Sequence, residues 1–101
     1  MTRREFAAAV RLADDCSTFE EYLRKSAPNW DGVSLRKIWE LMHCNFREIR
    51  AHTGLSQAEF SARYLMSKRA IESWEAGARE VPIYLRVLIA EVTGYLNLDL
   101  E

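Results

Sequence analysis

Apolar residues recur at helical spacing through most of the chain. From Arg3 to Asp15 they form one stripe, and the alanines at positions 7–9 favour helix, so a first helix is predicted there. Ser17 to Glu20 has the pattern of a capping box and predicts a short helix that ends near Ser26. The stripe of the first helix consists of Phe6, Val10 and Ala13.

A longer apolar repeat runs from Ser34 to Gly54, after a loop rich in helix-breaking residues at positions 28–32. It predicts either one long helix or two helices that break near Asn45. In the second case Asn45 and Glu48 would form another capping box.

The second half of the chain predicts three more helices. Two short ones cover residues 57–64 and 68–75, and the last has Pro82 in its first turn and ends near Thr93. Its inward residues are expected to be Ile83, Val87, Leu88 and Val92. The last residues alternate between apolar and polar, as in a short strand or a frayed tail, and we favour the tail. The prediction is therefore an all-α fold, a bundle of five or six helices.

The stretch from Ser56 to Gly77 contains two of these helices joined by a tight turn. Ser56 and Glu59 form a capping box at the start of the first, and Ser67 is the expected N-cap of the second. The apolar residues of the stretch would share one small core where the helices cross: Phe60, Tyr64, Met66, Ile71 and Trp74. This layout is typical of a helix-turn-helix that reads DNA.

Further residues at fixed spacings surround this stretch: Phe46, Arg50, Gly54-Leu55-Ser56-Gln57, Glu59-Phe60, Ser67, Ile71, Trp74-Glu75-Ala76-Gly77 and Pro82. Together they resemble the phage-repressor-like helix-turn-helix proteins of the XRE family, which include the lambda repressor, Cro proteins and many plasmid and antitoxin regulators. The resemblance covers about Asn45 to Tyr95. It implies a lambda-repressor-like core behind an N-terminal helical extension. It also implies a sequence-specific regulator of transcription, a repressor of its own operon in a phage, plasmid or other mobile element.

The start of the second motif helix carries the candidates for contact with DNA bases. Lys68, Arg69 and Ser73 face outward in this arrangement, and their side chains are donors of the kind that reach guanine edges and phosphates. Trp74 is assigned to the core, because it shares the inward face with Ile71.

Other residues are expected to hold the DNA backbone or the fold. Gln57 lies at a helix N-terminus, where its amide and the backbone N–H groups can bind a phosphate, and the resemblance implies the same role. Ser67 and Arg79 are the other expected phosphate contacts. The resemblance further implies that Arg50 pairs with Glu75 and clamps the first motif helix to the third.

Leu65 departs from the family pattern. The turn between the two motif helices usually has a glycine, which permits a left-handed backbone, and this chain has a leucine there. An unchanged backbone would cost on the order of 1 kcal/mol. Either the turn is reshaped or the strain is tolerated.

The composition argues against an enzyme and against a metal or cofactor site. No nucleophile and base have supportive spacing, and no glycine-rich phosphate loop is present. Cys16 and Cys44 lie far apart, and neither they nor His43 and His52 match a zinc pattern.

The net charge of −1 conceals a weakly basic segment. Residues 34–80 hold eight Lys and Arg against six Glu, and the excess acid lies nearer the ends of the chain. Such a protein is expected to depend on a matched site and on dimerisation more than on general attraction to phosphate. We therefore expect a homodimer on an inverted-repeat operator in double-stranded DNA. The expected contact surface is Tyr84, Leu85, Leu88, Val92, Tyr95, Leu96 and Leu98.

Three segments are expected: a helical extension at 1–33, the DNA-binding domain at 34–95 and a tail at 96–101. The extension is rich in aromatic residues, which either complete the core or bind a partner, as in an antitoxin that wraps a toxin and represses the shared operon. No apolar run is long enough to span a membrane, and the N-terminus lacks a secretory pattern, so a cytoplasmic protein is expected.

Overall fold

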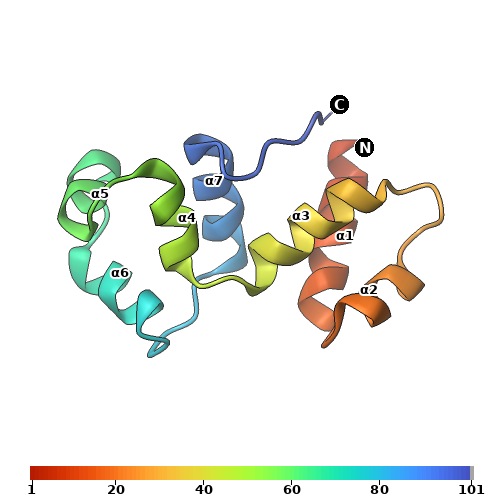
Figure 1. Ribbon diagram of the computed structural model, residues 1–101, viewed down its shortest axis with the longest axis horizontal. Helices are drawn as coiled ribbons and strands as arrows, with labels where there is room; N and C mark the ends of the chain where they lie inside the picture. The colour runs from red at the N-terminus through yellow and green to blue at the C-terminus, as the bar shows by residue number, and fades with distance from the viewer. Residues whose placement is uncertain (101) are drawn as a thin grey trace. The chain divides into compact units, whose positions relative to one another are not determined.

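The computed structural model describes residues 1–100 and is helical throughout, with seven helices and no strand in that range (Figure 1). The all-α prediction is confirmed. The helices are α1 (Arg3–Asp15), α2 (Phe19–Lys25), α3 (Gly32–His43), α4 (Phe46–Thr53), α5 (Gln57–Tyr64), α6 (Lys68–Glu75) and α7 (Ile83–Thr93).

The helix count exceeds the predicted five or six because the chain breaks between α3 and α4. Asn45 has an extended backbone, with φ −71° and ψ 143°, and its side chain accepts the N–H of Arg47 as the N-cap of α4. The two-helix interpretation of this region is therefore the correct one. The cap of α2 is Thr18, whose hydroxyl accepts the N–H of Glu21, one residue later than the expected capping box.

The chain divides into two compact units. The first unit consists of residues 1–43 with the tail from Leu96, and the second unit is Cys44–Tyr95. These units differ from the expected segments, because α3 packs against α1 and α2 and belongs to the first unit. The tail also belongs to the first unit, where Leu96 is buried and the carbonyl of Asn97 accepts Lys37 Nζ at 3.5 Å.

The first unit has a core of its own. α1 packs along α3, and α2 closes the group (Figure 1). The Tyr22 hydroxyl donates to the carbonyl of Ala9 at 3.0 Å, and burial raises the pKa of this phenol. Trp39 stacks on Tyr22, with ring centroids 5.5 Å apart. The buried side chains include Phe6, Val10, Ala13, Leu35, Ile38 and Leu41.

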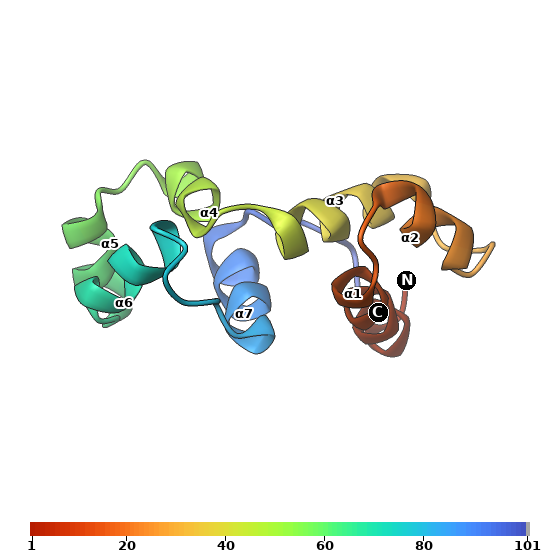
Figure 2. The same ribbon diagram turned by 90° about the horizontal axis from the view of Figure 1, so that it is seen from below.

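In the second unit α4 lies between α7 on one side and the pair α5 and α6 on the other (Figures 1 and 2). Phe46 of α4 meets Phe60 of α5 edge to face at 5.7 Å, and Trp74 of α6 at 5.1 Å. Ile49 and Ile71 are fully buried beside them. This apolar centre fixes α5 and α6 against α4.

The expected inward face of α7 is wrong. Ile83, Leu88 and Val92 are exposed and Val87 is half-buried, whereas the fully buried residues are Ile89 and Ala90. The half-buried Arg86 shares the inward face and donates to the carbonyl of Cys44 at 2.9 Å. Because a charged residue lies on the inner side of this apolar helix, the apolar pattern predicted the wrong set of inward-facing residues.

Candidate functional site

Arg50 and Glu75 form the centre of the second unit's polar network. Arg50 Nε donates to Glu75 Oε2 and Arg50 Nη2 to Glu75 Oε1, both at 2.8 Å. Arg50 Nη1 also donates to the carbonyl of Leu55 at 2.9 Å. The expected ion pair between α4 and α6 is therefore present and bidentate. The side chains are 16% exposed for Arg50 and 2% exposed for Glu75.

Three further residues complete the surroundings of Glu75. Gln57 Nε2 donates to Oε1 at 3.2 Å, and Arg47 Nε lies 3.5 Å from the same oxygen. Asn45 Nδ2 donates to the Glu75 carbonyl at 3.0 Å. The hydrogen bonds from Arg50 hold the pKa of the Glu75 carboxyl below its ordinary value, against the opposing effect of burial. The carboxylate is thus ionised at neutral pH. Its hydrogen bonds with Arg50 and Gln57 join α4, α5 and α6.

The turn between α5 and α6 is tight and well bonded. The capping box of Ser56 and Glu59 at the start of α5 is confirmed, with both hydrogen bonds formed. At the other end the Ser61 hydroxyl donates to the carbonyl of Met66, and the Met66 N–H donates to the carbonyl of Ser61. Leu65 between them is left-handed, with φ 54° and ψ 41°. Leu65 therefore adopts the left-handed conformation that a glycine would adopt without strain.

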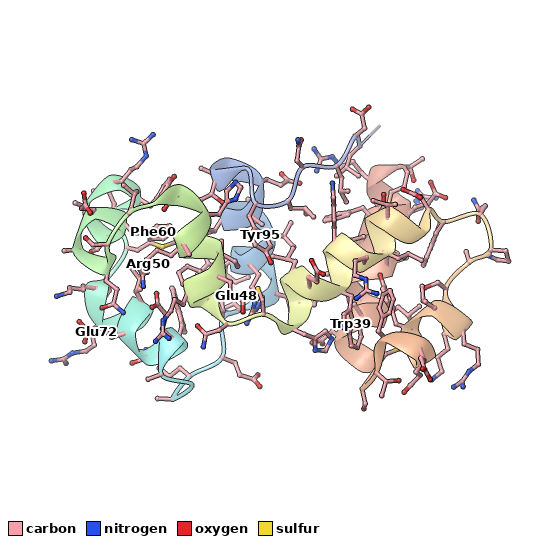
Figure 3. The ribbon with its side chains drawn as sticks, in the orientation of Figure 1. Trp39, Glu48, Arg50, Phe60, Glu72 and Tyr95 are labelled. Atoms are coloured by element: carbon pink, nitrogen blue, oxygen red, sulfur yellow. The ribbon has the colours of Figure 1, made fainter. Side chains whose placement is uncertain are left out.

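Ser67 is the N-cap of α6, and its hydroxyl accepts the N–H of Ala70 at 3.3 Å. Lys68 and Arg69 follow in the first turn, and both are exposed. Lys68 Nζ lies 3.8 Å from Glu72 Oε1, one turn further along the helix. Figure 3 shows Glu72 on the outer side of α6. The exposed face of α6 therefore presents cations at its N-terminal end and one carboxylate behind them.

The other predicted site residues, Ser73, Arg79 and Gln57, lie in three places. Ser73 is half-buried near the end of α6, and its carbonyl accepts the N–H groups of Ala78 and Arg79. Arg79 is exposed in the following loop. Gln57 lies at the N-terminus of α5 as predicted. Its side-chain amide donates to Glu75, so this N–H₂ group links α5 to α6.

Arg47 is a candidate that the sequence prediction missed. Its side chain is 66% exposed, and it is the second guanidinium beside one carboxylate that Arg50 already neutralises. Arg47 is thus an exposed cation whose carboxylate partner already has a bidentate partner in Arg50. The signal was present in the sequence, because Arg47 stands three residues before Arg50 and so shares its face of α4.

Comparison of the chain with known protein families, with curated proteins and with solved structures finds no match. Within residues 1–100 no three His, Cys, Asp or Glu side chains gather as a metal-binding group, and Cys16 and Cys44 form no disulfide there. In the same range no helix has the length and apolar character to cross a membrane.

Proposed function

We propose that the chain is a sequence-specific regulator of transcription that binds double-stranded DNA through α5 and α6 as a helix-turn-helix. The observation that carries the proposal is the clamp at Glu75. The clamp holds the inner side of α6 against α4, while Lys68 and Arg69 remain exposed in the first turn of α6. A rigid helix with exposed donors at its N-terminal end suits the major groove.

The charges of the second unit support the same function. Glu75 is neutralised internally, so the buried carboxylate does not repel phosphate. Arg47, Lys68, Arg69 and Arg79 are exposed cations available to the backbone or the bases. Ser67 and the backbone N–H groups at the start of α5 are the further phosphate contacts. The regulator acts in the cytoplasm, and repression of its own operon is the simplest role for so small a binder.

A homodimer on an inverted repeat completes the proposal. α7 carries three large apolar residues at four-residue spacing on its outer side, and they are 68%, 53% and 65% exposed: Tyr84, Leu88 and Val92. This stripe is narrower than the surface expected from sequence, because Leu96 is buried in the first unit. A two-fold pair of chains would read half-sites about 10 base pairs apart, or a multiple of that spacing.

The experiment is selection of duplexes from a random pool by the full chain, followed by titration of the selected site. The double variant Lys68→Ala with Arg69→Ala should lose at least about tenfold in affinity for that site, since each good base contact is worth about 1–3 kcal/mol. The matched control is Arg24→Ala with Lys25→Ala, which removes two exposed cations of α2 in the first unit. Equal loss in both variants would refute the assignment of α6 to the groove.

A second candidate function is that of an antitoxin. The observation that favours it is the separate core of the first unit, which leaves its aromatic residues unneeded by the second unit. The test is co-expression of the chain with the product of the neighbouring gene. Co-purification that survives Lys68→Ala with Arg69→Ala but not removal of residues 1–43 would support it.

A further inference from the structure

Leu65 is an anomaly of the second unit. Among residues 1–100 four backbones have a positive φ, and the other three belong to Gly54, Gly77 and Gly94. A leucine in this conformation brings its Cβ close to the following carbonyl oxygen, which a glycine avoids. The chain thus uses glycine at each left-handed position except the one between α5 and α6.

Burial of the side chain does not compensate for this strain. The Leu65 side chain is 93% exposed, the highest value among the exposed large apolar residues. The hydrogen bond that Leu65 makes as C-cap comes from its backbone N–H to the carbonyl of Ser61, so a glycine would make it equally well. Local strain without internal benefit is typical of residues whose role lies in contact with a ligand.

The neighbours of Leu65 indicate the chemistry of that ligand. Leu65 lies two residues before the N-cap Ser67 and three before Lys68, at the end of α6 that carries the exposed cations. The partner of this end is therefore anionic. In the major groove of DNA the apolar feature of a base edge is the 5-methyl group of thymine.

We propose that Leu65 is a specificity-determining residue that contacts a thymine methyl group beside the bases or phosphates reached by Lys68 and Arg69. The inference rests on the proposed function and names a base that the exposed donors of α6 do not select. The left-handed backbone holds the side chain out from the turn, and the tight bonding between Ser61 and Met66 fixes its direction.

The test uses the full chain and the duplex selected by it. Each thymine of the site is replaced in turn by deoxyuridine, which removes the methyl group and nothing else. The wild-type chain should bind about fourfold more weakly when the contacted thymine is replaced, and Leu65→Ala should be insensitive to that replacement. Leu65→Ala keeps the strained backbone and removes most of the side chain, so it separates the contact from the fold.

Leu65→Ala should also lose up to about tenfold in affinity for the unmodified site, with an unchanged dependence on salt. The matched control is Val33→Ala, a 65% exposed apolar residue of the first unit, which should bind like the parent. If the wild type selects a site but no thymine distinguishes it from Leu65→Ala, the inference is wrong and Leu65 serves a protein partner. If the wild type selects no duplex, the proposed function itself fails, and the inference with it.

Discussion

Replacement of Glu75 by glutamine should lower the free energy of unfolding of the second unit more than a comparable replacement on its surface does. The variant keeps the shape of the side chain and removes the charge that Arg50 binds through two hydrogen bonds of 2.8 Å. Arg50 is only 16% exposed, so its guanidinium cannot regain full hydration. Breaking such a pair by removing one partner costs about 3–5 kcal/mol when both groups are deeply buried, and about 3 kcal/mol is expected here.

That loss is large for a unit of this size. A stability of about 0.05–0.15 kcal/mol per residue gives about 3–8 kcal/mol for the roughly fifty residues from Cys44 to Tyr95. Glu75→Gln should therefore lower the urea midpoint markedly. Hydrogen exchange of peptides from residues 44–95 should accelerate, while peptides from residues 1–43 stay protected if the first unit keeps its own core.

Glu72→Gln is the matched control, because it removes a carboxylate from the same helix. Glu72 is 52% exposed and lies 3.8 Å from Lys68, so its loss should cost less than about 0.5 kcal/mol. A double variant, Arg50→Met with Glu75→Leu, should recover most of the stability, since no buried charge is left unpaired. If Glu75→Gln unfolds at the same urea concentration as Glu72→Gln, the clamp does not stabilise the unit.

Four further outcomes are expected. Because the pKa of Glu75 is lowered in the folded chain, its stabilising effect should be present above pH about 4.5 and be lost as the pH falls through the lowered value; urea midpoints from pH 7 to pH 3 should fall less in Glu75→Gln than in the parent. Leu65→Gly should raise the free energy of unfolding by about 1 kcal/mol while it weakens DNA binding, and a lower midpoint would show that the left-handed backbone carries no strain. Leu88→Glu should convert a homodimer to monomers in sedimentation at micromolar concentration, and an unchanged dimer would place the contact away from α7. Arg47→Gln should bind all duplexes more weakly and reduce the slope of log affinity against log salt by about 1, whereas an unchanged slope would exclude a phosphate contact.

Local signals in the sequence predicted the polar frame of the site. The capping box of Ser56 and Glu59 and the cap at Ser67 each need only neighbouring residues, so they could be identified without knowledge of the packing. The pairing of Arg50 with Glu75 spans 25 residues, and it was expected from the family resemblance rather than from spacing. The structure adds the place of Gln57 beside the same carboxylate, and it shows Arg47 there too, which the shared face of α4 indicated but the prediction missed.

The packing of helices was harder to predict because it depends on partners distant in sequence. The apolar repeat after Ser34 continues through Asn45, so nothing in its period shows that α3 packs on α1 while α4 packs on α7. α7 is apolar on nearly every side, and the buried Ile89 and Ala90, together with the bond from Arg86 to the carbonyl of Cys44, show which side faces in. Because the apolar pattern of α7 is ambiguous, it did not determine which residues face inward or which apolar residues are exposed.

The same reasoning explains why Leu65 is informative. Where the sequence departed from the family pattern, a reshaped turn and a strained turn were both possible, and they have opposite consequences. A reshaped turn would have changed the angle of α6 and removed the reason to compare its face with that of a DNA-reading helix. Leu65 has the left-handed backbone that favours glycine, and the connection between α5 and α6 is tight. Because the side chain of Leu65 adds strain and is not buried, we propose that its role lies in what the chain binds, and this makes Leu65 a sharper probe of the proposed function than the cations beside it.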